Sequence, residues 1–431
     1  MSVKDQANPS RLHGLASWAT SLRYEDIPQA VIDHTKDFFL DTLACTLGGR
    51  DHAAIIALVE LTKKMGPPSG PCEVIPFPDM KTSPAFAALV NGVCSHVVEQ
   101  DDLHNHMLHA AVVFPSALAV SQDVRATGKE LLAACVVGYE FACRTGEFLS
   151  PSHYKNFHTT ATAGVIGACA ASSFLLKHNT ETMLSAIGTA VHTSHACFNS
   201  VCAAYLAGAG LLSPTNILEG AKGMGNTLTG LDIKPSAIDS KLGEKWSVLE
   251  SSFKWHASCR HKHPSVDALL KLMSRTGTRF EDSEAVKVFT YQAAINVLSL
   301  SEKAETVHQS KFSMGFGLAV AAKNGHATIN DFTEDALEDK DLREFQKRVT
   351  IFLSQEVENL FPEKWTGGLL VETADSVKGD PDQTLTRDEI EAKARNLAAY
   401  GRVKDMGHLD ATIRKIWSLE TEPSMLGFAF K

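Results

Sequence analysis

The sequence predicts a mainly α-helical fold, with a large helical region, a smaller α+β region and a return to helix near the C-terminus. Up to Trp255, apolar residues recur at spacings of three and four, which is the period of an amphipathic helix. After Trp255 the stretches 285–292 and 367–376 alternate and are β-branched, which is typical of strands. The expected domains are a helical domain of residues 1–255 with 396–431 and an α+β domain of residues 256–395.

The first elements of the chain read as helices with clear end signals. Residues 11–22, 28–49 and 51–66 each carry helical periodicity, and the last two run into Gly-Gly and Gly-Pro-Pro sequences that end helices. Residues 72–77 are a short strand-like piece. The small and apolar residues 83–98 then predict a closely packed, buried helix.

Small side chains dominate the middle of the helical region. Helical periodicity covers residues 114–149, with a break near Gly128. Residues 158–176 are rich in Ala, Gly, Ser and Thr, and small side chains let helix backbones approach closely. We therefore expect residues 158–176 to form a helix at the centre of a bundle, with residues 181–197 and 202–211 continuing in the same style.

The second region mixes the two kinds of element. Helical segments are expected around 311–324 and 341–360, between the two strand-like stretches. Residues 387–401 form a well-patterned helix, and residues 410–420 follow it with a similar pattern. This alternation predicts the smaller α+β domain and the return to helix.

Composition and charge exclude several classes of protein. The chain has 431 residues and a formal net charge of -9, which argues against a general nucleic-acid binder. No run of about eighteen apolar residues is present, so we expect no membrane span. The polar N-terminus lacks an apolar signal region, and the nine scattered cysteines contain no C-x-x-C pair. We expect an intracellular protein, cytoplasmic or in the mitochondrial matrix, that is not secreted.

The segment Cys94–Pro115 concentrates titratable groups between two apolar runs. It contains three carboxylates and three imidazoles, namely Glu99, Asp101, Asp102, His104, His106 and His109. Such groups are costly to bury, and a hydrophobic core does not need them. Proton transfer does need them, because imidazole and a tuned carboxylate both work near neutral pH. A solvated polar loop and a metal site are the alternative interpretations.

Two further places carry histidine beside a predicted helix start. His158 precedes the small-residue helix, where Thr159 or Thr160 can cap the helix and its N-terminus favours a bound anion. A basic cluster, at a helix start marked by Pro264, suits an anionic ligand. That cluster consists of His256, Arg260, His261, Lys262 and His263. The alternatives are a surface histidine in the first case and a solvated basic loop in the second.

Metal and nucleotide motifs are weak or absent. The polar segment contains H-x-H-x-x-H and the basic cluster contains H-x-H, but neither has the spacing of H-E-x-x-H or a cysteine pair. The chain has no P-loop and no strand-led G-x-G-x-x-G, and we interpret the glycine-rich residues 220–230 as a flexible surface loop. We therefore expect neither a metal nor a cofactor.

Six motifs spread over the chain point to one known family. The main three are E-x-D-D-x-H at 99–104 with H-x-A at 109–111, F-H-T-T-A-T at 157–162, and C-R-H-K-H-P-S-V-D-A at 259–268. The supporting three are L-D-T-L-A-C-T-L-G-G at 40–49, P-T-N-I-L-E-G-x-x-G at 214–223 and K-F-S-M-G-F at 311–316. With these motifs the sequence resembles the MmgE/PrpD family, which includes 2-methylcitrate dehydratase, cis-aconitate decarboxylase and iminodisuccinate epimerase.

The resemblance implies both an architecture and a set of site residues. The architecture is a large helical domain built from both chain ends, a smaller α+β lid domain and a homodimer. The resemblance also implies an active site that lies between the domains and uses no cofactor or metal. The expected catalytic residues are His109, His158, His263, Glu99 and Asp102. The expected substrate-binding residues are Arg260, His261, His104 and Lys311.

The family chemistry is proton movement at a carbon next to a carboxylate, which needs an acid or base and donors for the developing charge. We expect His109 and His158 to do the acid/base work. Arg260, His261 and His263 would bind the substrate carboxylates, with His263 also a candidate proton donor. Glu99 or Asp102 would orient an imidazole and raise its pKa.

The leading expectation is a lyase that dehydrates 2-methylcitrate or another 2-alkylcitrate. Decarboxylation of cis-aconitate to itaconate, epimerisation and a non-catalytic relative are the alternatives. The last is motivated by a departure from the family pattern, because relatives usually carry a Lys-x-x-His-x-Gly-x-Ala stretch before the L-E-G element. Here no lysine occurs between Lys177 and Lys222, and Leu103 stands where relatives often have threonine.

Overall fold

The computed structural model describes the chain from residue 10 to residue 429, apart from residues 106–107, 110, 155–156, 192–195, 230–231, 300–303, 363, 365, 370–371 and 375. For residues 108–109, 368–369 and 372–373 it describes the backbone alone. Contacts within the chain divide it into two compact units. Unit 1 comprises residues 1–95, 106–250 and 393–431, and unit 2 comprises residues 96–105 and 251–392.

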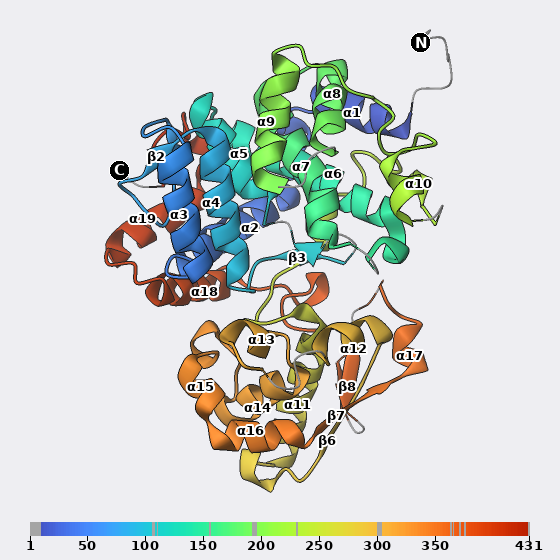
Figure 1. Ribbon diagram of the computed structural model, residues 1–431, viewed down its shortest axis with the longest axis vertical. Helices are drawn as coiled ribbons and strands as arrows, with labels where there is room; N and C mark the ends of the chain where they lie inside the picture. The colour runs from blue at the N-terminus through green and yellow to red at the C-terminus, as the bar shows by residue number, and fades with distance from the viewer. Residues whose placement is uncertain are drawn as a thin grey trace. The chain divides into compact units, whose positions relative to one another are not determined.

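Unit 1 is helical, as Figure 1 shows. Its helices are α1 (Arg11–Ser21), α2 (Gln29–Gly48), α3 (Ala53–Met65), α4 (Pro84–Val97), α5 (Val113–Asp123), α6 (Gly128–Tyr154), α7 (Thr159–Leu175), α8 (Thr180–Val191), α9 (Ala196–Gly208), α10 (Met224–Thr229), α18 (Arg387–Tyr400) and α19 (Met406–Trp417). The last two residues of α4 and the first six of α18 fall in unit 2. The short strands β1 (Cys72–Glu73) and β2 (Lys81–Thr82) pair antiparallel, and β4 (Leu108–His109) is a third short strand. The predicted mainly helical fold is confirmed.

Helix α7 is the centre of unit 1, because it packs against α5, α6, α8 and α9. Its small residues permit this packing. A Cβ atom at Gly167 would come within 2.4 Å of the Gly138 carbonyl oxygen and 2.6 Å of the Ala142 Cβ on α6. Only glycine at this position lets the two backbones approach so closely. The composition of residues 158–176 therefore predicts the position of α7 correctly.

Unit 2 contains a four-stranded sheet with the order β7-β6-β8-β9. Strands β6 (Val286–Thr290) and β7 (Val349–Leu353) are parallel, with Val286 opposite Val349. Strand β8 (Gly367–Leu369) pairs antiparallel with β6, and β9 (Glu372–Ala374) pairs antiparallel with β8. Helix α11 (His263–Thr276) packs on β8 and β9, and its hydrophobic contact joins Ala268 to Ala374 and Val377.

The other elements of unit 2 are short. The helices are α12 (Gln292–Leu298), α13 (Val307–Lys311), α14 (Met314–Asn324), α15 (Glu334–Glu338), α16 (Lys340–Lys347) and α17 (Gln355–Glu358), with a 3₁₀ turn at Arg260–Lys262. Strands β3 (Leu103–His104) and β5 (Ser251–Ser252) pair antiparallel. This pairing attaches the segment His96–Asn105 to a strand about 150 residues further along the chain.

Three local expectations were wrong. The stretch 341–360 is not one helix, because β7 separates α16 from α17. The stretch 367–376 contains two paired strands in place of one. The glycine-rich stretch is not simply a surface loop, because Met224–Thr229 forms α10 and buries Met224. In each case tertiary pairing or packing outweighs a local pattern.

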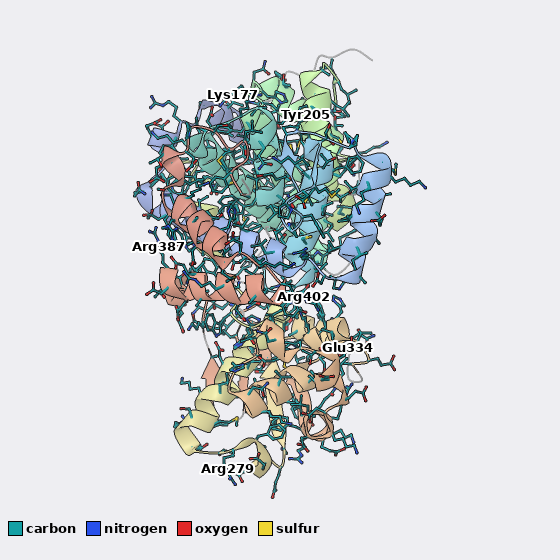
Figure 2. All side chains as sticks on the ribbon, turned by 90° about the vertical axis from the view of Figure 1, so that its left-hand side faces the viewer. Lys177, Tyr205, Arg279, Glu334, Arg387 and Arg402 are labelled. Carbon is teal, nitrogen blue, oxygen red and sulfur yellow. The ribbon has the colours of Figure 1, made fainter. Side chains whose placement is uncertain are left out.

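Charged side chains lie mainly on the surfaces of the two units. Lys177 pairs with Glu130 on unit 1, and Arg279 pairs with Asp282 on unit 2. The side chains of both pairs are solvent-accessible, and Figure 2 labels Lys177 and Arg279. Such exposed pairs contribute little to stability, typically ~0.2–1 kcal/mol. Within the described residues, no helix is long and apolar enough to cross a membrane.

Candidate active site

Unit 2 contains a buried group of charged side chains, some of which come from the segment His96–Asn105. Lys254 is fully buried, and its Nζ lies 3.1 Å from Glu99 Oε2 and 3.4 Å from Asp101 Oδ1. The second oxygen of Asp101, Oδ2, lies 2.9 Å from Nδ1 of His96. Glu99 and Asp101 therefore share one ammonium, and Asp101 also contacts an imidazole. These contacts offset the cost of burying the two carboxylates.

The pKa values in this group reflect a competition between burial and charge. Burial alone would lower the pKa of Lys254, but Glu99 and Asp101 outweigh it and the net pKa is raised. Burial would also lower the pKa of His96, and the Asp101 carboxylate again reverses the effect, so that the pKa is raised. Both cations are therefore stabilised in their charged forms.

The backbone of this segment is held in an unusual conformation. Glu99 has φ 55°, in the left-handed region that non-glycine residues seldom adopt. Contacts on both sides stabilise it: Lys311 donates its Nζ to the Val98 carbonyl oxygen at 2.8 Å, and Gln100 donates to the Trp255 carbonyl oxygen at 3.0 Å. Strained residues of this kind concentrate at functional sites, where the surroundings must hold them in place.

Arg260 is a buried cation with spare donors. Only 3% of the residue is exposed, and its Nη2 pairs with Asp380 Oδ1. Asp380 Oδ1 also accepts a hydrogen bond from Ser252 Oγ at 3.0 Å. Among the residues that the structure describes, Nε and Nη1 of Arg260 have no hydrogen-bond partner. Two guanidinium N–H groups of this kind are suited to a carboxylate ligand.

His263 begins α11, and Pro264 occupies the first turn as the sequence predicts. The His263 ring is fully buried, and its Nε2 lies 3.1 Å from the Ser258 carbonyl oxygen, so the proton is on Nε2. Its Nδ1 has no partner within the described part of the chain. Burial lowers the pKa of His263 well below the usual range, and the neighbouring His256 and Arg260 lower it further. The ring is therefore neutral, and Nδ1 can accept a hydrogen bond.

The rest of the basic cluster has structural partners. His256 Nε2 lies 2.7 Å from Asp267 Oδ1, and His261 Nδ1 lies 2.7 Å from the Tyr291 hydroxyl. Lys262 is fully buried and donates to the carbonyl oxygens of Ser310 and Ser313 at 3.3 and 2.9 Å. Burial lowers the pKa of Lys262 to about 7. The cluster is therefore not the solvated basic loop that was the alternative interpretation.

The remaining expected site residues belong partly to each unit. Asp102 and His104 are buried in unit 2, with His104 in β3. In unit 1, His158 is exposed and is itself the N-cap residue of α7, without a side-chain capping bond, so neither Thr159 nor Thr160 is the cap. The backbone of His109 lies in β4, but its side chain lies outside the described residues, as does all of His106. The convergence of His109 and His158 with His263 stays a prediction.

The structure thus brings the expected residues Glu99, Arg260, His263 and Lys311 into unit 2, and adds Lys254 and Asp380. These two were missed from sequence because their partners are 155 and 120 positions away. The signal for Lys254 was weak: it stands two residues before the histidine that opens the basic cluster.

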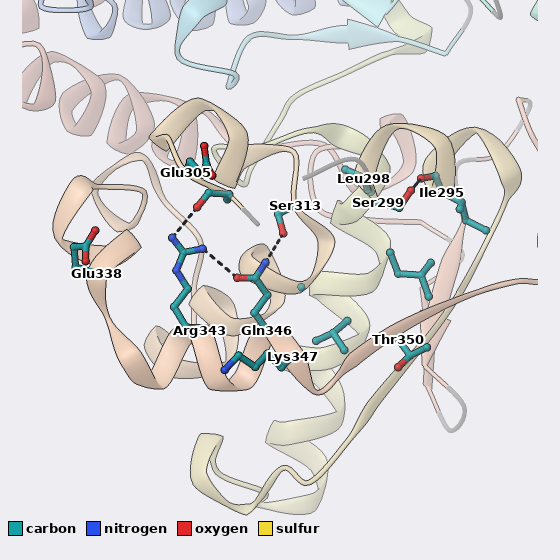
Figure 3. A pocket seen from close by; sticks show the side chains of 14 residues that line it. Ile295, Leu298, Ser299, Glu305, Ser313, Glu338, Arg343, Gln346, Lys347 and Thr350 are labelled. Carbon is teal, nitrogen blue, oxygen red and sulfur yellow. Dashed lines mark hydrogen bonds between the residues drawn. The ribbon is translucent and has the colours of Figure 1, made fainter. Parts of the chain in front are cut away.

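The large pocket of unit 2 is separate from these groups. It has a volume of ≈ 990 Å³ and is lined by α12, the start of α14, α16 and β7, with Arg343, Gln346 and Ser313 joined by hydrogen bonds (Figure 3). None of the expected catalytic residues whose side chains the structure describes lines it. Within the described residues, no group of three or more His, Cys, Asp or Glu side chains is arranged to hold a metal ion.

Comparison with known proteins identifies the chain. The N-terminal domain model of the MmgE/PrpD family matches residues 13–198, and the C-terminal domain model matches residues 256–418. The chain belongs to the MmgE/PrpD family. This confirms the resemblance found in the sequence motifs.

The curated relatives in this family are similar over most of their length. A cis-aconitate decarboxylase-like protein of Aspergillus oryzae is 26% identical over 94% of this chain and 94% of its own. The cis-aconitate decarboxylase of Aspergillus terreus is 25% identical over 82% of this chain and 81% of its own. The cis-aconitate decarboxylase of Homo sapiens is 23% identical over 78% and 76%, respectively.

Proposed function

We propose that this MmgE/PrpD protein is a lyase that acts on a citrate-like di- or tricarboxylic acid. The observation that carries the proposal is the pair formed by Arg260 and His263. A buried guanidinium with two N–H groups unbonded within the described residues adjoins a buried neutral imidazole with an open Nδ1. The first suits a carboxylate of the substrate, and the second suits a hydroxyl group or another hydrogen-bond donor next to it.

The reaction that we favour is decarboxylation of a cis-aconitate-like acid. The C–C bond to the departing carboxylate breaks, carbon dioxide leaves, and the electron pair stays on carbon until a proton is added there. Support comes from the curated relatives, which are named as cis-aconitate decarboxylases. Dehydration of a 2-alkylcitrate would use the same acid, base and carboxylate-binding groups. In that reaction a proton is removed from carbon and water is lost.

The roles of the individual residues follow from their charge states. Arg260 would anchor a carboxylate, and the ammonium of Lys254 would stabilise negative charge that develops during the reaction. His263 is neutral and its pKa is lowered, so we assign it hydrogen-bond acceptance and no longer proton donation. The proton would then come from His109 or His158, the other two histidines matched by the family motifs.

The direct test is product analysis of the purified protein. Mass spectrometry after incubation with cis-aconitate, 2-methylcitrate and longer 2-alkylcitrates should reveal loss of either carbon dioxide or water. The assay contains a strong chelator, because we expect no metal to be required. Itaconate from cis-aconitate supports decarboxylation, and a new C=C bond from an alkylcitrate supports dehydration. Unchanged acids in every incubation would favour a non-catalytic relative.

His158→Ala and His109→Ala should each lower the rate roughly 10²-fold or more, the usual scale for a positioned acid or base. The far-ultraviolet circular dichroism should stay that of the native protein, because His158 is exposed and outside the core. His13→Ala, a change at a partly exposed histidine of α1, is the control. Full activity in the double variant would contradict both assignments.

We also propose a homodimer, as the family resemblance implies. Size-exclusion chromatography with light scattering measures this independently of activity, and a mass of one chain would refute it.

A further inference from the structure

The large pocket of unit 2 has the size of a small-molecule binding site but lies outside the candidate active site. Its volume of ≈ 990 Å³ is at the upper end of the range of about 300–1,000 Å³ that is usual for such sites. The fourteen described residues that line it all fall in unit 2. One compact unit therefore forms these walls by itself.

One part of the lining is apolar. It consists of five side chains from α12, the segment that follows it and β7, namely Ile295, Leu298, Ala304, Val349 and Ile351. Thr350 lies between the last two and also lines the pocket. Successive side chains of a strand point to opposite faces, so three consecutive lining residues place the pocket at the edge of β7, which is an outer strand of the sheet. A ligand that covers this wall needs an apolar body.

Arg343 gives the pocket a positive charge that no carboxylate neutralises within the described residues. The residue is partly buried. Its Nε donates to the Leu337 carbonyl oxygen at 2.8 Å and its Nη2 donates to the Ala304 carbonyl oxygen at 2.7 Å. The guanidinium carbon lies 5.4 Å from the centre of the buried Phe316 ring. Neutral groups thus hold the guanidinium in place and leave its charge for an anionic ligand.

The other charged residues of the lining do not cancel this charge. Glu305 and Glu338 are exposed, so water and salt screen their carboxylates. Lys347 adds a second cation, whose partner Glu344 is exposed on the same helix. The partly buried guanidinium of Arg343 is therefore the strongest electrostatic feature that a ligand meets in this lining.

A row of hydrogen bonds joins the pocket to the basic cluster. Arg343 Nη1 lies 3.4 Å from Gln346 Oε1, and Gln346 donates its Nε2 to Ser313 Oγ at 3.3 Å (Figure 3). The carbonyl oxygen of Ser313 accepts a hydrogen bond from Nζ of Lys262 at 2.9 Å. Lys262 directly precedes His263 in the chain. Ser313 therefore contacts the pocket through its side chain and the basic cluster through its backbone.

The backbone of the segment 310–315 makes a second connection. The Cys259 N–H donates to the Lys311 carbonyl oxygen at 3.0 Å, and Nζ of Lys311 donates to the Val98 carbonyl oxygen at 2.8 Å. Val98 precedes Glu99, the residue with positive φ. This short segment thus lines the pocket at Ser313 and Gly315 and also holds two parts of the candidate active site.

We propose that the pocket binds an organic anion with an apolar ring system, and that this ligand restrains the basic cluster through the segment 310–315. The anionic group binds Arg343 and the rings cover the apolar wall. Inorganic anions and small acids without an apolar body leave that wall uncovered, so the site differs in chemistry from a second substrate site. Arg260 and His263 belong to the cluster that the ligand restrains, which makes the pocket a regulatory site.

Two dyes that differ by one group test the ligand class. 8-Anilino-1-naphthalenesulfonate has aromatic rings and a sulfonate, and N-phenyl-1-naphthylamine has the same rings without the charge. Fluorescence titration of the full-length protein measures the affinity of each. Arg343→Met should weaken the sulfonate about tenfold, the scale of a hydrogen bond to a charged group, and change the neutral dye less than about twofold. Arg348→Met, at an exposed arginine outside the lining, is the matched control. An unchanged sulfonate affinity, or equal losses for both dyes, refutes an anion site at Arg343.

A second variant locates the rings without removing any hydrogen bond of Arg343. Thr350 is exposed on the edge strand, where an aromatic residue is compatible with the strand. Thr350→Trp should fill the pocket and weaken both dyes about tenfold, whereas Thr350→Val should leave both affinities unchanged. Native affinities in Thr350→Trp place the dyes elsewhere and refute the assignment of the pocket.

Hydrogen exchange measured by mass spectrometry tests the link to the basic cluster. A ligand slows exchange that requires opening of its site by a factor of 1 + [L]/Kd, about tenfold at a dye concentration of ten times Kd. With the sulfonate dye bound, peptides that cover residues 310–316 and 258–264 should both slow by about this factor, and the peptide of α19 should not change. Slower exchange of 310–316 alone refutes the link, and no change in either peptide refutes the site. None of these measurements uses a substrate, so their outcome is independent of the proposed lyase activity.

Discussion

Arg260 is the residue whose geometry most directly predicts a kinetic effect. Its Nη2 is committed to Asp380, and Nε and Nη1 remain available within the described residues. Arg260→Lys keeps the charge but loses the planar pair of donors, so KM for the acid should rise more than kcat falls. Steady-state kinetics at saturating and limiting substrate measure the two effects. A fall in kcat alone, with KM unchanged, would show that Arg260 acts on the transition state and does not anchor the substrate.

Lys254 gives a prediction about stability. Lys254→Met leaves Glu99 and Asp101 buried without their shared cation, and loss of one partner of a buried pair costs ~3–5 kcal/mol. Lys63→Met removes an exposed pair with Glu60 and should cost less than ~0.5 kcal/mol. Urea unfolding of the two variants measures the difference. Equal midpoints would mean that the buried carboxylates do not depend on Lys254.

Individual residues differ in how far the sequence predicts them. Arg260 and His263 stand out because they share a ten-residue motif at a helix start, and this signal is local. Lys254 and Asp380 lack such a signal, because their roles arise from partners that only the folded chain brings close. The sequence pattern also could not show that His261 and His256 form hydrogen bonds with Tyr291 and Asp267, respectively. Electrostatic roles of buried groups therefore need the structure.

At the scale of elements, α7 shows how a sequence property becomes a packing constraint. Gly167→Ala should destabilise the protein by ~1–3 kcal/mol, because its Cβ would meet the Gly138 carbonyl oxygen and Ala142 of α6. The matched control is Gly14→Ala in α1, where the nearest atom to the new Cβ, on Asp239, is 3.9 Å away. That change should be neutral or stabilising by up to ~1 kcal/mol. Thermal unfolding of the two variants should show shifts of opposite sign or of clearly different size.

Helices were predicted better than strands for a physical reason. The periodicity of α2 or α18 is contained in the element itself, so its bounds were found to within one or two residues. Strand β7 is a five-residue, largely apolar run that follows a helix, and its strand neighbour in the sheet, β6, is about 60 residues away. A run of that length has no period that distinguishes strand from helix. The same reasoning applies to β3, whose pairing with β5 places Glu99 and Asp101 in unit 2.

On the scale of the whole molecule, buried histidines make stability depend on pH. His153 is fully buried, neither ring nitrogen has a hydrogen-bond partner within the described residues, and burial lowers its pKa to about 4. His263 is shifted in the same direction. Between pH ~4 and ~6.5 the unfolded chain binds protons at these positions and the folded chain does not, so stability falls as pH falls. His96 acts oppositely, because its raised pKa adds stability that is present below pH ~6.5 and is lost as pH rises.

Replacement of His153 separates these contributions. The ring stacks on Phe157 with centroids 5.4 Å apart, so His153→Phe keeps the shape and the stacking while it removes the titration. Each titrating group contributes at most ~1.4 kcal/mol per pH unit, so the variant should lose measurably less stability than the native protein between pH 7.5 and pH 5.0. Urea midpoints at pH 7.5, 6.0 and 5.0 provide the measurement, with His308→Asn at an exposed position as the control. Because phenylalanine also leaves no unbonded ring nitrogens in the core, the variant should be the more stable protein at every pH. Parallel curves for the variant and the native protein would show that His153 does not stay neutral in the folded chain.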